Sequence, residues 1–282
     1  MNVMNMFSLK GKTAILTGGA GKYGRQIVAA LAEAGADTYI ASRNIEALEK
    51  VAKAHRDKGE LVTAMQLELG DESSILALCK EIIKRSGKID ILVNNAVARI
   101  TKSWDDDLAN YEASWKINAT GLHAITRAVG KDMIHRQSGS IINIGSMMGM
   151  VGMENHNYDG TEMGTGWPSD YFFHKGGMIN YTRFCGSYFG RFNVRCNCIS
   201  PGGLYEEIHH KRFVENYSER TQLGRMANDT DLKGIIVFLA SDASAYLTGT
   251  NIPVDGGYSA KKEIQGGQCN FYPMECIGSK AG

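Results

Sequence analysis

The chain has 282 residues, of which 43% are hydrophobic and 22% are charged, as expected for a globular protein that buries a sizeable core. Its 31 basic and 30 acidic residues leave a formal net charge of +1 and form no basic block, which argues against binding to nucleic acid or to an anionic membrane. No apolar run is long enough to span a bilayer, and the first residues lack the apolar core of a secretory signal, so we expect a cytoplasmic protein.

The six cysteines are expected to be reduced thiols, because nothing in the sequence indicates an oxidising compartment. Cys196 and Cys198 have the wrong spacing for a zinc knuckle and lie in a strand-like run. His209 and His210 are adjacent, so their side chains diverge on a helix and do not converge on one ion. We therefore expect no metal site.

From residue 13 onward, short apolar runs alternate with segments whose apolar residues recur at helical spacing. Strands are expected at 13–19, 37–42, 61–69, 89–96, 139–146, 192–200 and 251–257. A helix is expected before Gly35, and further helices at 44–57, 72–86 and 111–136. This alternation, with strands that are apolar almost throughout, predicts an α/β fold with a parallel sheet covered by helices on both faces.

We expect one domain from about residue 8 to residue 260, followed by a tail at 261–282, because no repeat or linker interrupts the chain. Segments 147–170 and 202–225 look irregular, and each follows the carboxyl end of a predicted strand. Open parallel sheets bind ligands at that edge. Both segments are therefore candidates for lining a binding site.

A glycine-rich turn, "TGGAGKYG" (17–24), joins the first strand to the first helix. Gly18, Gly21 and Gly24 lie where a backbone has to turn tightly, approach a pyrophosphate and pack a helix against a strand. The N–H groups and dipole at the start of the helix favour phosphate. A glycine trio alone is a weak signal, but its position predicts dinucleotide binding over a merely structural turn.

The end of the second strand bears on the choice of cofactor. NAD-selective sites place an acid there to hold the adenosine ribose. This chain has Ser42 and Arg43 instead, with Lys22 inside the glycine turn. A hydroxyl and a cation suit the 2′-phosphate of NADP, so we expect NADP, with NAD as second choice and a surface arginine without a ligand as the structural alternative.

A tyrosine and a lysine are four residues apart in "YFFHK" (171–175), which on a helix places both side chains on one face. An ammonium at Lys175 would stabilise the tyrosinate of Tyr171 and ease its loss of a proton. Such pairs also occur by chance in many helices. The pentapeptide by itself leaves both interpretations open.

From Leu9 to Tyr258, the chain resembles the short-chain dehydrogenase/reductase family. The resemblance rests on the glycine turn and on motifs that follow it in the family's order, namely "NNA" (94–96), "KINATG" (116–121), "IGS" (144–146), "YFFHK", "NCISPGG" (197–203), "FLASD" (238–242) and "VDGG" (254–257). It implies a single-domain, doubly wound Rossmann fold and a homotetramer, with a dimer as second choice. It also implies a set of cofactor contacts, which are Gly18, Gly21, Lys22, Tyr23, Gly24, Ser42, Arg43, Glu68, Leu69, Asn95, Ala96, Tyr171, Lys175, Pro201 and Gly202.

The same resemblance implies a catalytic tetrad of Asn118, Ser146, Tyr171 and Lys175. Tyr171 would be the general acid in ketone reduction and the base in alcohol oxidation, with Lys175 beside it and in contact with the nicotinamide ribose. Ser146 would donate a hydrogen bond to the substrate oxygen. Asn118 would hold a water that links the lysine to solvent.

Tyr158 competes with Tyr171 for the role of the acid–base group. It lies at the family's usual distance from Ser146, but its partner four residues on is Glu162, and a carboxylate raises the pKa of a phenol. Only Tyr171 has a lysine at that spacing. We therefore assign Tyr171, with an insertion before it.

The insertion 153–168 is rich in hydrogen-bonding side chains and should lie beside Tyr171, which suits a polyol, sugar or sugar acid better than a lipid chain. A solvated loop or a subunit contact remains the structural alternative. Arg99, after the fourth strand, could meet a carboxylate or phosphate, and segment 203–222 is expected to be a substrate lid. The expected substrate contacts are Ser146, Met148, Tyr171, His156 and Arg99.

The sequence thus predicts an NAD(P)-dependent oxidoreductase that interconverts a secondary alcohol and a ketone on a polar, small-molecule substrate. An alternative is a 3-oxoacyl thioester (acyl-carrier-protein) reductase, which a basic docking patch would favour. A second alternative is a dinucleotide-sensing binding protein that has lost its chemistry. Activity that depends on Tyr171 would separate the enzymes from the binding protein.

Overall fold

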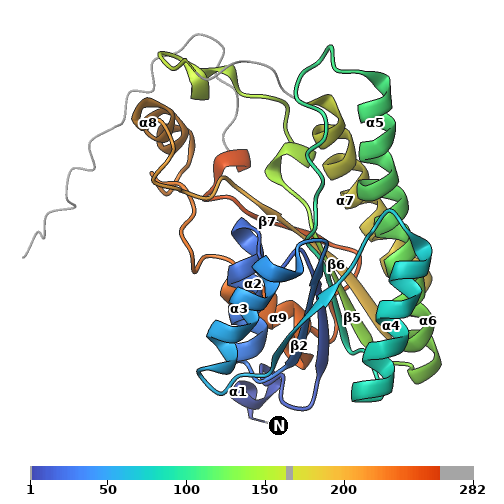
Figure 1. Ribbon diagram of the computed structural model, residues 1–282. Coiled ribbons are helices and arrows are strands. Elements are labelled where there is room, and N and C mark those ends of the chain that lie inside the picture. The colour runs from blue at the N-terminus through green and yellow to red at the C-terminus, as the bar shows by residue number, and fades with distance from the viewer. Residues whose placement is uncertain (1, 163–167, 261–282) are drawn as a thin grey trace, which may run out of the picture.

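The computed structural model of the chain describes residues 2–162 and 168–260. Within them, seven parallel strands form one sheet in the order β3-β2-β1-β4-β5-β6-β7 (Figure 1). The strands are β1 (Thr13–Thr17), β2 (Asp37–Ser42), β3 (Val62–Gln66), β4 (Ile91–Asn94), β5 (Gly139–Ile144), β6 (Val194–Pro201) and β7 (Asn251–Val254). This confirms the predicted doubly wound, single-domain α/β fold, whereas the tail expected at 261–282 lies outside the described residues.

Helices cover both faces of the sheet (Figure 1). One face packs against α2 (Lys22–Glu33), α3 (Ile45–Arg56) and α9 (Lys233–Ala240). The other packs against α4 (Glu72–Ser86), α6 (Leu122–Arg136) and α7 (Ser169–Gly190). The remaining α-helices are α1 (Val3–Met6), α5 (Leu108–Trp115) and α8 (Lys211–Arg220).

The apolar strands divide their side chains between two cores. Along β1, Ala14 and Leu16 join the core beneath α2 and α9, whereas Ile15 joins the core beneath α4 and α6. Successive side chains on a strand point to opposite faces, so a strand buried on both faces is apolar at most of its positions rather than at every second one. Each fully buried Leu or Ile contributes about 1.5–3 kcal/mol, so the two cores together stabilise the scaffold that carries the site.

The helix expected at 111–136 is longer than predicted and is interrupted. It begins at Leu108, where Asp107 caps the N–H of Ala109 at 2.9 Å, and it passes through a π-helix at Lys116–Gly121 before α6. A Cβ at Gly121 would lie 2.4 Å from the carbonyl oxygen of Leu69, so the helix backbone approaches the segment after β3 closely. Apolar periodicity does not reveal one wide turn, yet such turns often mark functional sites.

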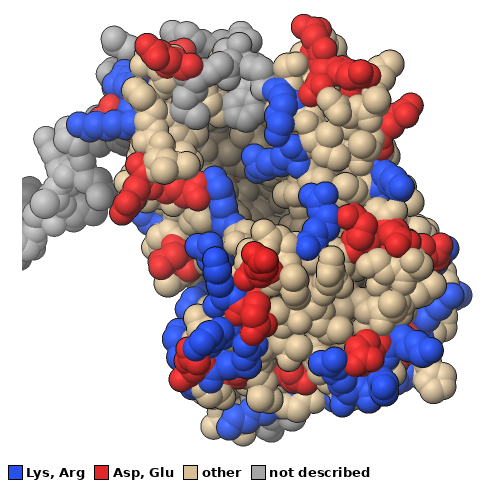
Figure 2. Space-filling model, viewed as in Figure 1, with Lys and Arg blue, Asp and Glu red and all other residues tan. Residues whose placement is uncertain are grey.

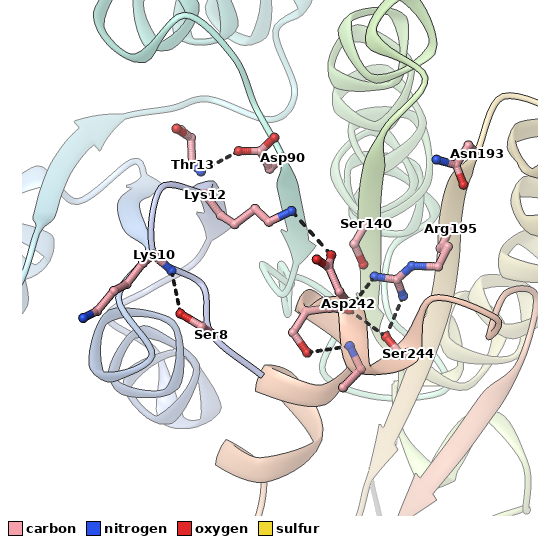
Figure 3. A network of polar contacts seen from close by, with 12 residues as sticks. Ser8, Lys10, Lys12, Thr13, Asp90, Ser140, Asn193, Arg195, Asp242 and Ser244 are labelled. Atoms are coloured by element: carbon pink, nitrogen blue, oxygen red, sulfur yellow. Dashed lines mark hydrogen bonds and ion pairs between the residues drawn. The ribbon is translucent and has the colours of Figure 1, made fainter. Parts of the chain in front are cut away.

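Polar contacts tie the strands together at their amino ends, opposite the carboxyl edge (Figure 3). Asp90 accepts a hydrogen bond from the N–H of Thr13 at 2.9 Å, which joins β4 to β1. Arg195 on β6 donates to Ser244 at 2.7 Å, and Lys12 lies 3.5 Å from the carboxylate of Asp242. These polar groups are one another's hydrogen-bond and ion-pair partners, so we infer that this edge of the sheet stabilises the fold and does not bind a ligand.

A third, smaller cluster lies beyond the carboxyl edge of the sheet. It joins α8 to the segment after β5 and to the last described residues, through Met147, Phe213, Tyr217, Met226 and Tyr258. A short helical turn, Asn155–Tyr158, packs against α8, and Asn157 donates to the hydroxyl of Tyr258 at 2.8 Å. The two segments predicted to be irregular thus form a wall above the sheet, and the second contains a helix.

Candidate active site

A cleft of about 770 Å³ opens at the carboxyl edge of the sheet. It lies where the strand order reverses, because β1 pairs with β2 on one side and with β4 on the other, and open α/β sheets bind ligands at such a point. Figure 2 shows the hollow in the face of the molecule, with Lys and Arg side chains on its rim. Every residue predicted to contact the cofactor lines this cleft.

The glycine turn forms the floor of one end of the cleft, and its glycines have different reasons to be there. Gly18 has φ +76°, where a side chain is strained, and a Cβ at Gly24 would lie 2.2 Å from the carbonyl oxygen of Gly18. Gly21, by contrast, is exposed to the cleft and has ordinary space for a Cβ. Packing therefore explains Gly18 and Gly24, whereas the bare backbone at Gly21 suits the approach of a ligand.

The start of α2 fits a phosphate group. Gly21 is its N-cap residue and provides no side-chain hydrogen bond, so the first N–H groups of the helix are not capped by it. Tyr23 is the second residue of α2, and its hydroxyl donates to the carbonyl oxygen of Gly202 at 2.8 Å. This hydrogen bond joins the glycine turn to the end of β6. The residues present therefore fit the pyrophosphate of a dinucleotide at this helix terminus.

Asn95 braces the glycine turn from β4. Its Nδ2 donates to the carbonyl oxygens of Thr17 and Gly18 at 3.1 and 3.0 Å. The hydroxyl of Thr17 in turn accepts from the N–H groups of Asn95 and Ala96, both at 3.1 Å. The predicted contacts Asn95 and Ala96 thus also hold the turn in its shape.

Charged side chains surround the end of the cleft formed by β2 and β3. Ser42 and Arg43 line it at the end of β2, and Arg43 lies 3.9 Å from the carboxylate of Glu68, which is followed along the wall by Leu69. Lys22 forms an ion pair with Glu206, which lies beyond Pro201 and Gly202 at the end of β6. The cations expected to meet a 2′-phosphate are therefore present, but each has an acid beside it.

Tyr171, Lys175 and Ser146 line the other end of the cleft. The first two are on α7, and the Lys175 Nζ lies 5.7 Å from the centre of the Tyr171 ring while donating to the carbonyl oxygen of Ile144 at 2.6 Å. Ser146 follows β5, and its oxygen accepts the N–H of Met148 at 3.2 Å. Among the described residues no acceptor takes the Ser146 proton, so it can be donated into the cleft.

Lys175 is only 4% exposed, and burial lowers its pKa from the ordinary value of 10.5. Desolvation is the main cause, because it disfavours the charged form, and Tyr171 and Cys198 oppose it. Arg99 lowers the pKa further through like-charge repulsion. The lysine is thus placed where it can interact with a tyrosinate through a medium of low polarity.

Asn118 does not line the main cleft but a small cavity behind it. The π-helix carries this side chain to Ala98, where Oδ1 accepts the backbone N–H and Nδ2 donates to the backbone oxygen, both at 2.8 Å. The cavity has a volume of about 10 Å³ and is also lined by Lys175 and His174. That volume is on the order of one water molecule. The residues of the predicted tetrad thus lie around two adjoining spaces.

Four of the five predicted substrate residues line the main cleft, namely Ser146, Tyr171, Arg99 and Met148. The Arg99 guanidinium carbon lies 5.0 Å from the centre of the Tyr171 ring, and the side chain is exposed. A guanidinium over an aromatic face is held by the ring quadrupole. Among the described residues the Arg99 guanidinium makes no hydrogen bond or ion pair, and only its backbone oxygen accepts from Lys102, so its N–H groups can meet an anion.

The structure places the fifth predicted substrate residue, His156, apart from the cleft. It lies on the outer side of the Asn155–Tyr158 turn, where it contacts Asp159 at 2.8 Å, and it does not line the cleft. Tyr158, two residues on, points inward instead and packs against Phe213 with ring centres 5.2 Å apart. Polarity alone cannot tell which side of a short turn faces a ligand.

Tyr158 lines the cleft as well, and its pKa is raised. The expectation that it is a poor acid–base group therefore agrees with the structure, but the predicted cause does not. Burial is the main cause of the higher pKa, with Tyr258 second, rather than the carboxylate of Glu162.

Segment 203–222, expected from the sequence to be a lid, adds three residues to the cleft wall that were not assigned to the site individually, namely His209, Phe213 and Tyr217. Phe213 and Tyr217 are one turn apart on α8, a spacing that could have identified the face of this helix that is buried. Tyr217 donates to the sulfur of Met147 at 3.2 Å and accepts from the N–H of Gly203 at 2.5 Å. Burial and the nearby Lys22 lower the pKa of His209.

The described cysteines, Cys79, Cys185, Cys196 and Cys198, are free and buried. Cys196 and Cys198 lie on β6, as expected for buried thiols in a strand. Cys269 and Cys276 are outside the described residues. No helix among the described residues is long and apolar enough to cross a membrane.

Comparison with known proteins agrees with this geometry. A family model described as Enoyl-(Acyl carrier protein) reductase (adh_short_C2) matches residues 22–259. The Escherichia coli K12 protein named uncharacterized oxidoreductase YgcW is 33% identical over 267 residues, which cover 90% of this chain and 95% of that protein. D-threitol dehydrogenase of Mycolicibacterium smegmatis is 30% identical over 260 residues, with the same coverage.

Solved structures share the fold as well. The crystal structure of a gluconate 5-dehydrogenase from Burkholderia cenocepacia J2315, in complex with NADP and tartrate, superposes with a TM-score of 0.81 at 28% identity and covers 93% of this chain and 100% of that one. The match of the family model over most of the chain agrees with the parallel sheet, the glycine turn and the cleft. The protein is therefore an oxidoreductase of the short-chain dehydrogenase/reductase family.

Proposed function

We propose that this enzyme interconverts a secondary alcohol and a ketone on a polar sugar, polyol or sugar acid, with NADP as its cofactor. The observation that carries the proposal is the convergence of Tyr171, Ser146 and Lys175 on the cleft that the glycine turn also lines. The dinucleotide would therefore bind at one end of the same cleft that has the acid–base residues at its other end. The nicotinamide, when bound, supplies or accepts the hydride.

Each member of the proposed tetrad has a role that its contacts support. Tyr171 gives a proton to the substrate oxygen in reduction and takes it back in oxidation. The Ser146 hydroxyl donates to the same oxygen, because its oxygen accepts from Met148 and no acceptor among the described residues takes its proton. Lys175 stabilises the tyrosinate, and the small cavity between Lys175 and Asn118 has room for the water that would return the proton.

The preference for NADP is supported by the residues at the end of β2. Ser42 and Arg43 offer a hydroxyl and a guanidinium there, and a carboxylate at that position would repel a 2′-phosphate. Glu68, close to Arg43, could instead accept from ribose hydroxyls and favour NAD. NADP therefore remains the first choice and NAD the second.

The carbohydrate-like substrate is supported by the cleft and by the relatives. Arg99 presents N–H donors beside Tyr171, and a guanidinium binds carboxylate with two parallel hydrogen bonds. D-threitol dehydrogenase and gluconate 5-dehydrogenase, by their names, act on a polyol and a sugar acid. The name of the family model points instead to an acyl-carrier-protein substrate, which keeps the acyl thioester as the rival to be tested.

The test is a substrate screen with NADPH and with NADH, run on the wild type and on Tyr171→Phe. We expect oxidation or reduction of a polyol or sugar acid, faster with NADP(H), and a loss of about 10²–10⁴-fold in Tyr171→Phe because the proton donor is gone. Activity of Tyr171→Phe at the wild-type level would overturn the mechanism. Reduction of 3-oxoacyl thioesters alone would replace the proposed substrate class and leave the mechanism in place.

A further inference from the structure

A buried carboxylate lies directly before the proposed catalytic tyrosine. Asp170, in the first turn of α7, is 2% exposed and accepts hydrogen bonds from the hydroxyls of Thr101 and Ser114. Those residues come from the segment after β4 and from α5, so Asp170 joins three parts of the chain. A buried charge costs stability unless it is paired or fully hydrogen-bonded, so its presence next to the site calls for a reason.

The hydrogen bonds around Ser114 have a definite direction. Its hydroxyl proton goes to Asp170, because a carboxylate only accepts. Its oxygen is then left to accept, and it receives Nδ2 of Asn118 at 2.9 Å and contacts Nε2 of His174 at 3.3 Å. A hydroxyl has one proton and two lone pairs, so these three contacts use its full capacity and place a proton on Nε2 of His174.

This direction and the backbone of Ala98 together fix how the Asn118 amide is oriented. Nδ2 uses both of its protons, one for Ser114 and one for the carbonyl oxygen of Ala98. Oδ1 therefore faces the N–H of Ala98 and keeps one lone pair for another donor. With the amide reversed, Oδ1 would face the lone pairs of Ser114, and Nδ2 would face an N–H group.

His174 connects the hydrogen bonds around Ser114 to the small cavity. It lines that cavity together with Asn118 and Lys175, and its ring packs against Trp115 with centres 4.9 Å apart. Burial lowers its pKa, with Lys175 acting in the same direction and Asp170 against it, so the ring is neutral near pH 7. A neutral ring is consistent with the single Nε2 proton that the hydrogen bonds require.

We propose that Asp170 is a positioning residue which, through Ser114, holds the Asn118 amide and the His174 ring in the orientations that proton return between Asn118 and Lys175 requires. The inference rests on the proposed function, because it assigns Asp170 to the tetrad's proton path. Asp170 touches neither substrate nor cofactor in this role. Its effect reaches the reaction only through Asn118 and His174.

The chain provides a matched pair of variants for the test. Ser114→Ala and Thr101→Val each remove one hydroxyl that donates to Asp170, but only Ser114 continues to Asn118. We expect Ser114→Ala and Asp170→Ala to lower kcat by about 10-fold, with KM and the cofactor dissociation constant changed less than about 2-fold. Thr101→Val should lower the thermal midpoint and leave kcat unchanged.

A double-mutant cycle with Asn118→Ala gives the decisive reading. If Asp170 acts through Asn118, Ser114→Ala lowers kcat less than about 2-fold further in the Asn118→Ala background. Equal losses of kcat in Thr101→Val and Ser114→Ala, or full additivity in the cycle, would overturn the inference. Should Asp170→Ala fail to fold, Ser114→Ala decides, since it removes a single oxygen.

Failure of the proposed function has a different signature. If the Tyr171→Phe variant reacted at the wild-type rate, the tetrad mechanism itself would be rejected, whatever the double-mutant cycle shows. An unchanged kcat in Ser114→Ala, with Tyr171→Phe inactive, would reject only the role of Asp170.

Discussion

At the scale of single residues, the site depends on where a few charges are placed. Lys175 is buried beneath Tyr171, whereas Arg99 lies over the face of the same ring and is exposed. A buried cation interacts with a developing tyrosinate at low dielectric, and an exposed one can exchange its contacts for those of a ligand. The two cations around one tyrosine are therefore suited to different tasks.

Arg99 leads to a prediction about substrate charge. Arg99→Met should raise KM for a sugar acid by about 10-fold or more, because a charge-assisted hydrogen bond is worth about 1.5–3 kcal/mol. KM for a neutral polyol should stay within about 2-fold, since no carboxylate is then lost from the guanidinium. Steady-state kinetics on the two substrate classes checks this, and equal effects on both would show that Arg99 acts only by packing.

His174 leads to a prediction about stability and pH. Because burial lowers its pKa below 6.5, the unfolded chain binds a proton that the folded chain does not. Its contribution is fully present above pH about 6.5 and is lost as the pH falls below that value. His174→Gln should therefore flatten the fall of the thermal midpoint as the pH drops below about 6.5.

The control for this experiment is His135→Gln, because His135 is exposed at the end of α6. It should leave the pH dependence of the thermal midpoint unchanged. If both variants show the wild-type slope, His174 does not take up a proton on unfolding in this range, and the neutral ring assigned to it is wrong.

At the scale of elements, an ion pair links the start of α2 to the segment before α8. Lys22 pairs with Glu206, and His209 lies 3.8 Å from the same carboxylate. Tyr23 adds a hydrogen bond to Gly202. The glycine turn and the proposed lid are thus joined across the cleft, at the place where the cofactor phosphates are expected.

This link leads to a prediction about cofactor affinity. Glu206→Gln should tighten NADP(H) binding by about 2–5-fold, since an exposed ion pair contributes about 1 kcal/mol or less and Lys22 would no longer be shared. Titration of NADPH fluorescence measures the dissociation constant. Glu207→Gln, at an exposed neighbour with no ion pair among the described residues, is the control. Weaker binding in Glu206→Gln would mean that the pair holds the lid closed over the cofactor.

At the scale of the whole molecule, the outer face of α7 is unusually aromatic. Phe184 and Tyr188 are 59% and 46% exposed, and their rings stack with centres 6.0 Å apart. Tyr181 extends the row toward α6, where its hydroxyl contacts His123 at 2.9 Å. Exposed apolar side chains that gather on one face indicate an interaction surface, and we propose that the homotetramer implied by the family resemblance covers this one.

The assembly is checked by sedimentation of the wild type and of Phe184→Glu. We expect a tetramer for the wild type and smaller species for the variant, because a carboxylate on this face would be buried without a partner. Leu76→Glu, at an exposed apolar residue on α4, should leave the assembly intact. A wild-type monomer would reject the tetramer, and an intact Phe184→Glu tetramer would place the interface elsewhere.

The sequence by itself determined the parallel sheet and the order of elements along the chain, and it predicted the residues of the glycine turn and strand ends that line the cleft. Strands that are buried on both faces are mostly apolar, and a backbone with positive φ favours glycine, so these features are recorded locally in the chain. The pairing of Tyr171 with Lys175 is local as well, because both lie on one turn of α7.

Only the tertiary structure decided which side chains face the cleft from the segments beyond the sheet. It placed Tyr158, Phe213 and Tyr217 inside and His156 outside, because packing between the Asn155–Tyr158 turn and α8 orients both elements. It also brought Asp170 to Ser114, 56 residues away in the chain. Contacts between distant segments depend on the whole packed molecule, so no local pattern in the sequence records them.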